Sequence, residues 1–218
     1  MGPFDVIVHN LPFLLVGLKV TAELSAIAIV GGTALGLLLG IIRYMRWPVL
    51  NAITFAFIEL IRGTPLLVVL FICYFALPAL LSYHTTAYNA AALGFVLFIS
   101  AYLAEDFRSG LRSIRPQTVQ AALATGLTPV QTLRFIVVPQ AVRRVIPTIF
   151  SQYVRVFKFT SVASVIGIHE LTGSALLVNA REFRPIVLLA TVALTYFVCC
   201  YAISLVGRLL YKKLMIRL

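Results

Sequence analysis

The stretch Arg115–Pro139, RPQTVQAALATGLTPVQTLRFIVVP, is the one long polar segment with clear helix punctuation in an otherwise apolar chain. Pro116 stands where a helix would begin, and at that position the missing N–H of proline costs nothing. Residues 117–125 then predict two to three helical turns. Gly126 follows at the point where a helix commonly ends in a left-handed residue, so this half of the stretch predicts one short helix.

A second short helix is predicted directly after the first. Thr128 suits an N-cap and Pro129 suits the first helical position. On the first helix, the small side chains of Ala121, Ala122 and Ala124 offer a smooth surface. Taken alone, the stretch favours an ordinary interfacial helix between two membrane spans over a surface that receives another protein.

The composition is that of an integral membrane protein. Of the 218 residues, 61% are hydrophobic and 11% are charged, and the mean hydropathy is +1.01. A soluble domain of this size needs less apolar surface, and it needs more charge to cover itself. Because a spanning helix takes ~20 apolar residues, the length allows five or six spans in one all-α membrane domain over residues 1–218.

The formal net charge of +11 fits a membrane protein better than a nucleic-acid-binding one. Positive loops resist translocation, so Lys and Arg accumulate at the cytoplasmic face. No nucleic-acid-binding motif combines these charges with exposed aromatic residues. Cys73, Cys199 and Cys200 fall inside apolar runs without ligand spacing, which predicts buried small side chains and neither disulfides nor a zinc site.

Five transmembrane spans are expected, joined by short connections. Their ranges are Leu11–Ile42, Leu50–Leu81, Ala87–Leu103, Val145–Ile168 and Ile186–Val206. The first span has a small-residue side that permits close helix contact, made of Gly31, Gly32, Gly36 and Gly40. Between the last two spans, His169–Pro185 predicts a polar connection in which His169 is a solvated loop residue.

The second span is interrupted near its middle. Gly63 and Pro65 loosen one turn and remove a helix hydrogen bond, which predicts a kink. Glu59 and Arg62 are three residues apart and can pair on one helix face just before the kink. A structural ion pair and a role in a translocation pathway both remain open for this pair.

The fourth span is the least apolar of the five. Ser151, Arg155 and Lys158 follow helical spacing and predict a polar stripe along one face. Lys158 would lie about 20 Å along the helix from Val145, which is deeper than a lysine at a helix end needs to be. A watery pathway explains this depth, and a tilted or broken helix that brings Lys158 to the outer interface is the alternative.

The distribution of Lys and Arg predicts the topology. Twelve of the 18 lie in three groups, near Arg43, around the opening stretch and in the tail from Arg208 to Arg217. Five spans place all three groups on one side of the membrane. The positive-inside rule makes that side cytoplasmic, so the N-terminus is expected outside and the loop of about residues 109–143 in the cytoplasm with the C-terminus.

Several function classes are disfavoured by missing motifs. The chain has no G-x-x-x-x-G-K-[ST] loop to cradle ATP phosphates. It also has no Ser/His/Asp, H-E-x-x-H or Cys/His arrangement suited to hydrolysis. No catalytic residue and no cofactor is therefore expected in this chain. A five-span protein with a polar cytoplasmic helix is expected to work as a subunit.

The spacing within the opening stretch resembles the EAA signature of bacterial ABC importer permeases. Gln120-Ala121-Ala122 is followed after three residues by Gly126, and after nine more by Ile136–Pro139. Further segments resemble the polar amino-acid permeases of this family: Arg62–Pro65, Ala101-Tyr102 with Glu105, Leu133–Pro147, Lys158–Ser161 and Ser164–Ile166. The resemblance extends from about Leu11 to Lys213.

The resemblance implies a type I importer permease of the bacterial inner membrane. Its expected partners are two cytoplasmic ATPase subunits that carry ATP and Mg²⁺, a second permease copy or sister subunit, and a periplasmic or lipid-anchored amino-acid-binding protein, in a lipid membrane and without nucleic acid. In such permeases the EAA helix docks into a groove on the ATPase. The expected coupling residues are Gln120, Ala121, Ala122, Gly126, Leu127 and Pro139.

Two positions depart from the family pattern. Gln120 stands in place of the signature glutamate, which removes a charge from the coupling helix. Phe159 stands in place of the aspartate of Lys-Asp-Thr-Ser, which removes a carboxylate from the fourth span. A basic amino acid is therefore disfavoured as substrate. Acidic or neutral polar amino acids, such as glutamate, aspartate or glutamine, are favoured because Arg155 and Lys158 complement a carboxylate.

The expected substrate path combines the polar residues of the second and fourth spans. They are Glu59, Arg62, Gln152, Arg155, Lys158, Thr160 and Ser161. An autonomous secondary transporter would use the same charged residues for ion coupling, although no inverted repeat is evident. A structural or assembly subunit without a pathway is a third interpretation, and the polar stripe speaks against it.

Overall fold

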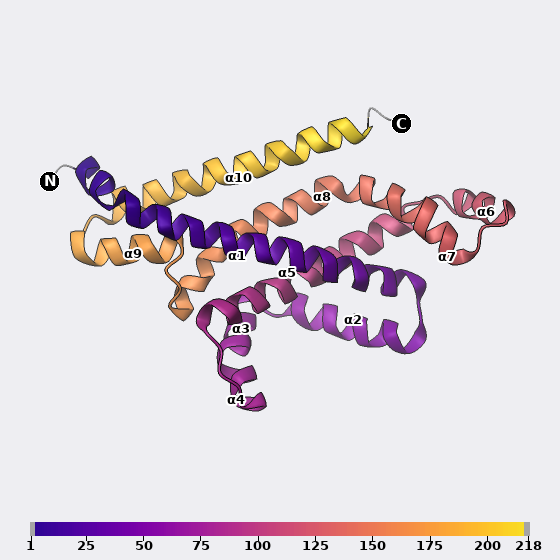
Figure 1. The fold of residues 1–218 in the computed structure, drawn as a ribbon, viewed down its shortest axis with the longest axis horizontal. Coiled ribbons are helices and arrows are strands. Elements are labelled where there is room, and N and C mark those ends of the chain that lie inside the picture. Colours follow the sequence, from indigo (N-terminus) through magenta and orange to yellow (C-terminus); the bar gives the residue numbers. More distant parts are fainter. Residues whose placement is uncertain (1–2, 216–218) are drawn as a thin grey trace.

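The structure is a computed structural model that describes residues 3–215. It is an elongated bundle of helices in which α1 begins at one end of the long axis, while α6 and α7 form the other end, beyond the last turns of α10 (Figure 1). No strand occurs among residues 3–215, so the all-α prediction is confirmed. Arg217, which the sequence assigned to the basic tail, lies outside the described residues.

The chain alternates long helices with short or irregular ones. The first half contains α1 (Pro3–Met45), α2 (Pro48–Gly63), α3 (Leu66–Phe71), the π-helix η1 (Ile72–Ala76), α4 (Leu77–Leu81) and α5 (Ala87–Arg112). The second half contains α6 (Pro116–Ala124), α7 (Pro129–Thr132), the π-helix η2 (Leu133–Val137), α8 (Val138–Phe159), the 3₁₀ helix η3 (Thr160–Ile166), α9 (Leu171–Glu182) and α10 (Pro185–Met215).

Length and apolar composition identify three of these helices as membrane spans. They cover Asp5–Met45, Ala87–Arg112 and Pro185–Lys213. Two further spans are bent: residues 48–63 and 66–81 meet at 111°, and residues 129–166 and 171–182 meet at 48°. The five predicted spans are recovered when each bent pair counts as one. The sharper bend lies at Thr64-Pro65, where the sequence predicts a kink.

Close packing of α1 on α5 depends on the predicted glycine side of the first span. A Cβ atom at Gly36 would lie 2.8 Å from Leu103 Cβ and 3.0 Å from the Ser100 carbonyl oxygen. A Cβ atom at Gly40 would lie 2.8 Å from Phe107 Cβ. Such contacts are too short for any larger residue, so the expected close helix contact is confirmed.

The buried apolar residues form separate clusters along the long axis. The largest joins α1, α3, α5 and α8 around Phe95, Leu70 and Ile99, which are at most 1% exposed. A second cluster at the N-terminal end joins α1, α9 and α10 through Leu14, Val178 and neighbouring residues. A third lies at the opposite end, beneath α6 and α7. The two smaller clusters therefore hold the two ends of the bundle.

The prediction of a polar connection over His169–Pro185 is wrong for most of its length. Residues Leu171–Glu182 form α9, which buries Leu171, Ala175 and Val178 against α1 and α10. These three residues are spaced four and three apart, so they share one helix face. The charged residues at the end of the segment hid this periodicity. His169 is exposed, as predicted.

Glu170 is the residue that fixes this second cluster. Its side chain is 0% exposed and caps α9 by accepting hydrogen bonds from the backbone N–H groups of Thr172 (3.0 Å) and Gly173 (2.8 Å). It also accepts hydrogen bonds from the hydroxyl groups of Tyr196 on α10 (2.8 Å) and Thr21 on α1 (3.3 Å). A single buried carboxylate thus joins three helices.

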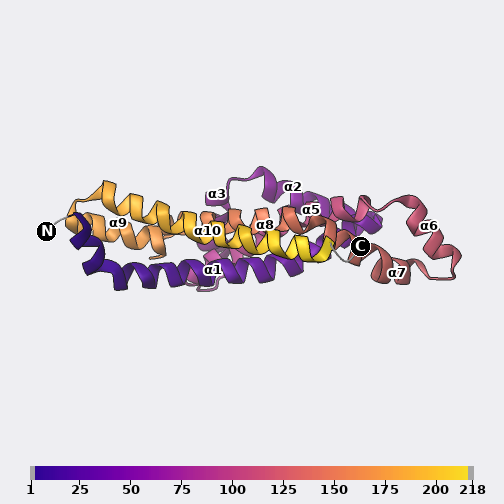
Figure 2. The ribbon, with the colours of Figure 1, turned by 90° about the horizontal axis from the view of Figure 1, so that it is seen from above.

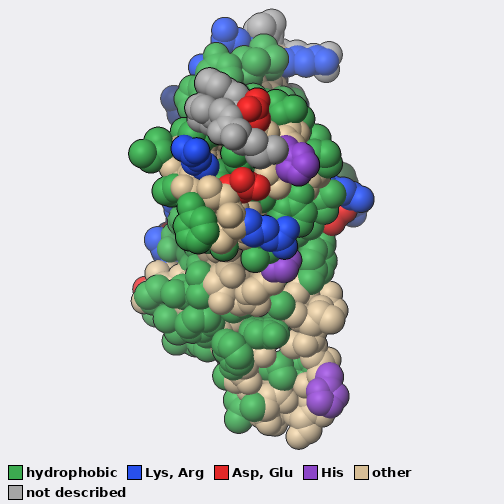
Figure 3. Space-filling model, turned by 90° about the vertical axis from the view of Figure 1, so that its left-hand side faces the viewer, with side chains coloured by type: hydrophobic (Ala, Val, Ile, Leu, Met, Phe, Trp, Pro, Cys, Tyr) green, Lys and Arg blue, Asp and Glu red, His purple; other side chains and the backbone are tan. Residues whose placement is uncertain are grey.

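The two ends of the bundle differ in charge. Figures 1 and 2 place α6 and α7 at one end, with α10 finishing short of them, and α9 with the start of α1 at the other end. Arg208, Lys212 and Lys213 lie on the last turns of α10. Figure 3 views the opposite end and shows acidic, basic and histidine side chains interspersed among apolar ones. The assignment of the α6 end to the cytoplasm stays a prediction.

Candidate functional site

The opening stretch forms the predicted pair of short helices at one end of the bundle. Pro116 begins α6, and the chain leaves it at Gly126 with φ +87°. Thr128 caps α7 by accepting a hydrogen bond from the Gln131 N–H (3.3 Å), while the Thr128 N–H donates to Gln131 Oε1 (2.9 Å). This reciprocal capping box fixes the direction in which the chain returns to the membrane.

The expected coupling residues divide between two sides of α6. Gln120 and Ala121 are exposed, together with Gln117 and Ala124. These four residues have the spacing i, i+3, i+4 and i+7 and form one side of the helix, which we call the exposed face of α6. Ala122 is 8% exposed and points inward.

The other two expected coupling residues lie near α6 in the chain. Leu127 is half-buried in the turn that follows Gly126, and Pro139 is exposed near the start of α8. The side of α6 that is open to a partner is therefore flat and uncharged, because it consists of two amides and two alanines.

A groove lies on the inner side of α6. It has a volume of about 180 Å³ and is lined by Tyr44, Met45, Val119, Leu123, Pro129, Thr132, Leu133 and Val137. The Thr132 hydroxyl is buried and has no hydrogen-bond partner among the described residues. The groove separates the end of α1 from the helix pair, and α6 packs on α7 and η2.

A second site lies at mid-length, where α2, α5 and α8 converge on one ring. The guanidinium carbons of Arg62 and Arg155 each lie 5.5 Å from the ring centroid of Tyr102. Glu59 and Arg62 form the predicted pair at 3.9 Å, with side chains 58% and 38% exposed. Arg155 forms no ion pair with any residue in the described range 3–215. Two cations thus contact one aromatic ring, and only Arg62 forms an ion pair with a carboxylate.

Asp106 belongs to this site and was missed by the sequence reasoning. It lies one helical turn after Tyr102 on α5, and Gln152 Nε2 donates a hydrogen bond of 2.9 Å to its Oδ2. Gln152 is 7% exposed, and its Oε1 is buried without a partner in the described part of the chain. The site therefore contains a carboxylate and an unused amide acceptor beside the two guanidinium groups.

The polar stripe of α8 occurs as predicted. Ser151, Arg155 and Lys158 are all exposed along one side of the helix. Thr160 is 0% exposed and its hydroxyl donates to the Phe157 carbonyl oxygen, so it lies off the stripe. The chain changes from α to 3₁₀ geometry at this residue, which rotates the following side chains away from the face of α8.

Ser161 lies beside the stripe, half-buried. Its hydroxyl donates to the Lys158 carbonyl oxygen at 2.8 Å. The path residues that the structure brings to an open surface are therefore Glu59 and Arg62 on α2 and Arg155 and Lys158 on α8. Gln152 is buried behind this surface and is connected to it by its hydrogen bond to Asp106.

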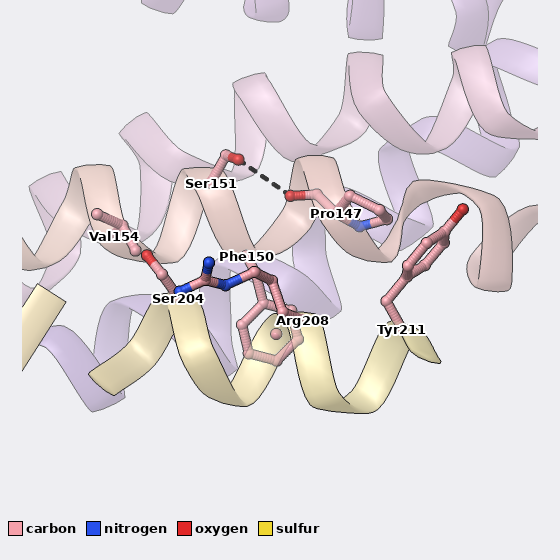
Figure 4. Close-up of a pocket in the computed structure, with 8 residues that line it drawn as sticks. Pro147, Phe150, Ser151, Val154, Ser204, Arg208 and Tyr211 are labelled. Carbon is pink, nitrogen blue, oxygen red and sulfur yellow. Dashed lines mark hydrogen bonds between the residues drawn. The ribbon is translucent and has the colours of Figure 1, made fainter. Parts of the chain in front are cut away.

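An open groove borders the stripe between α8 and α10. Its volume is about 360 Å³, and its lining is Pro147, Phe150, Ser151, Val154, Ser204, Gly207, Arg208 and Tyr211 (Figure 4). Ser151 is common to the groove and the stripe, and its hydroxyl donates to the Pro147 carbonyl oxygen at 3.0 Å. One side of α8 is thus open along much of its length.

The described residues offer no obvious place for a metal ion. No group of three or more His, Cys, Asp or Glu side chains lies together within residues 3–215. Cys73 is buried as predicted, whereas the prediction of burial is wrong for Cys199 and Cys200, which are half-buried on α10; all three are free thiols. The chemistry of the site is therefore that of guanidinium, ammonium, carboxylate and amide groups.

Comparisons with known proteins extend over nearly the whole chain. A family model described as binding-protein-dependent transport system inner membrane component matches residues 32–216. The probable glutamine ABC transporter permease protein of Bacillus subtilis (strain 168) is 42% identical over 206 residues, which cover 92% of this chain and 93% of that protein. The glutamine transport system permease protein of Escherichia coli (strain K12) is 34% identical over 207 residues, 94% of each chain.

A solved structure shares the fold. The crystal structure of an amino acid ABC transporter with histidines matches with a TM-score of 0.88 and 27% sequence identity, covering 95% of this chain and 96% of that chain. Sequence and fold thus point to the same group of proteins.

Proposed function

The chain belongs to the family of binding-protein-dependent transport system inner membrane components and is the permease of an amino-acid ABC importer; we propose that its substrate is glutamine. Both curated relatives described above are named for glutamine. The fourth span supports a neutral side chain, because Phe159 removes the carboxylate that would attract a cationic one.

The observation that carries the proposal is the placement of Arg155. Its guanidinium lies against Tyr102 beside Arg62, it is exposed on the polar stripe, and it forms no ion pair within residues 3–215. A charge at this depth in a membrane bundle needs an anionic or watery neighbour. Asp106 on α5 supplies one anionic neighbour. The α-carboxylate of an amino acid would supply a second on the open side of α8, where Lys158 lies one turn away on the same face.

The arrangement of partners follows from the two ends of the bundle. We infer that the exposed face of α6 contacts a cytoplasmic ATPase, which carries ATP and Mg²⁺. The open side of α8 then faces a second permease subunit across the substrate path. The binding protein delivers the amino acid at the α9 end, and the N-terminus lies on that outer side.

Reconstitution tests the proposal. The permease is incorporated into liposomes with its ATPase and binding protein, and ATP-dependent uptake of glutamine and arginine is measured. We expect glutamine uptake and little arginine uptake. Arg155→Gln and Lys158→Ala lower glutamine uptake at least tenfold while the complex with the ATPase still forms, whereas Thr148→Ala, an exposed change on the same helix, has little effect.

Two results would count against it. Unchanged uptake in both charge variants removes the stripe from the substrate site. Uptake by the permease alone, driven by an ion gradient and independent of ATP, favours a secondary transporter instead.

A further inference from the structure

The segment Phe107–His169 has an unusual charge composition. It contains eight Lys and Arg residues and no Asp or Glu. It includes α6, α7 and η2, which form one end of the molecule in Figures 1 and 2. Any protein that meets this end therefore encounters cationic side chains without a single carboxylate among them.

Two of these cations lie on α6 and on the neighbouring η2. Arg115 is the exposed N-cap residue of α6. Arg134 is exposed on η2, and its guanidinium carbon lies 5.4 Å from the ring centroid of Phe135. Neither arginine takes part in an ion pair within residues 3–215. Both charges are thus available to a partner.

The exposed face of α6 is neutral. Gln117, Gln120, Ala121 and Ala124 carry no charge. Exposed apolar side chains follow on α7 and η2, with Val130 at 63% and Phe135 at 58%. This end of the molecule therefore combines uncharged side chains with exposed arginines, as protein interfaces combine an apolar centre with a polar rim.

We propose that the ATPase partner presents an acidic rim to this end, with carboxylates that pair with Arg115 and Arg134 around the neutral face of α6. This inference rests on the proposed function, because it names the chemistry of the partner expected there. Complementary charge at the margin of an interface steers encounter and fixes orientation. The neutral Gln120 leaves that task to the two arginines.

Binding measurements at two salt concentrations test the inference. The purified permease and ATPase are mixed in a neutral detergent, and affinity is measured at 50 mM and 500 mM NaCl. We expect the double variant Arg115→Glu/Arg134→Glu to bind at least tenfold more weakly at 50 mM NaCl. The difference shrinks at 500 mM because salt screens charges at the rim.

A matched control uses the other end of the molecule. Arg181→Glu/Arg184→Glu reverses two exposed arginines near α9 and changes the net charge by the same amount. We expect its affinity to stay within twofold of the unmodified protein. An equal loss in both double variants would show that net charge alone governs association, and it would overturn the inference.

A charge introduced at Gln120 gives an independent test, because the direction of the change in affinity for the ATPase reports the charge of the partner surface. Gln120→Glu places a carboxylate at the centre of the face, and an acidic partner surface should then weaken binding severalfold. Gln120→Met has a side chain of similar length to glutamate but no charge, so this variant should bind the ATPase as the unmodified protein does. Tighter binding of Gln120→Glu would indicate a basic groove and overturn the inference.

Two other outcomes are distinguishable. Normal, salt-independent binding by Arg115→Glu/Arg134→Glu overturns the acidic rim and leaves the proposed function intact, whereas failure of the unmodified permease to bind any ATPase contradicts both. If the double variant loses binding only in nanodiscs that contain phosphatidylglycerol, the arginines contact lipid headgroups and the inference is overturned.

Discussion

The Tyr196 hydroxyl donates a hydrogen bond of 2.8 Å to Glu170 Oε2, which ties α10 to the cap of α9. Glu170 is 0% exposed, so loss of one hydrogen-bond donor leaves its buried carboxylate oxygen with fewer hydrogen bonds and no water to replace the lost one. We expect Tyr196→Phe to lower the free energy of unfolding by about 1–3 kcal/mol. Thermal unfolding of the purified protein in detergent measures the effect.

Tyr201→Phe is the control, because Tyr201 lies on the same helix and is 54% exposed. Its melting temperature should match that of the unmodified protein. Equal melting temperatures for Tyr196→Phe and Tyr201→Phe would contradict the role of the buried hydrogen bond.

Close packing at Gly36 predicts a strong dependence on side-chain size. Gly36→Leu forces atoms against the Ser100 carbonyl oxygen and the Ala104 backbone, which cannot move away as a flexible side chain can. We expect destabilisation of at least ~1–3 kcal/mol and a large fall in the amount of folded protein in the membrane. Ala34→Leu, an exposed change two residues away, should be tolerated. Quantitative immunoblotting of membranes compares them.

The turn after α6 depends on backbone conformation and has open space around it. Gly126 has φ +87°, and a Cβ atom there would meet nothing within 4 Å. Gly126→Ala therefore costs about 1–2 kcal/mol locally without a clash. We expect uptake to fall severalfold at an unchanged amount of membrane protein.

Two matched variants isolate this backbone effect. Gly63→Ala also adds a Cβ atom in open space, but at an ordinary φ, and should keep full uptake. Gly126→Asn should recover part of the activity, because asparagine tolerates the left-handed conformation. Full uptake by Gly126→Ala would show that this conformation is unnecessary for coupling.

At Tyr102, we expect uptake to depend on the aromatic ring and not on the hydroxyl group. Tyr102→Leu removes the aromatic ring that both Arg62 and Arg155 contact, and each lost contact is worth about 0.5–2 kcal/mol. We expect glutamine uptake to fall at least tenfold, because both guanidinium groups lose their positions. Tyr102→Phe keeps the ring and should retain most of the uptake. Equal uptake by Tyr102→Leu and Tyr102→Phe would contradict the shared-ring arrangement.

The sequence predicted those elements that depend on short patterns of neighbouring residues. Apolar runs gave the five spans, and the glycine side of the first span gave its close contact with α5. Proline, glycine and threonine at defined helix positions gave α6, α7 and the turn at Gly126. These features depend on residues within a few positions of one another, so a single sequence carries them.

Other features depend on contacts between distant parts of the chain. Gln152 and Asp106 are 46 residues apart, and no local pattern indicates that they pair. Thr160 lies off the stripe because the α-helix changes to a 3₁₀ helix there, and no residue nearby in the sequence indicates this change. In contrast, α9 had a usable signal, since Leu171, Ala175 and Val178 recur at helical spacing.

The length of α1 has a mechanical consequence. Its 43 residues, at ~1.5 Å each, make it about twice as long as the ~30 Å hydrocarbon layer. At one end, Tyr44 and Met45 line the groove beneath α6; at the other, Val6 and Leu14 pack in the apolar cluster with α9 and α10. One helix therefore takes part in both ends of the bundle, so a displacement of α1 along its axis would change the packing at the α6 end and at the α9 end together.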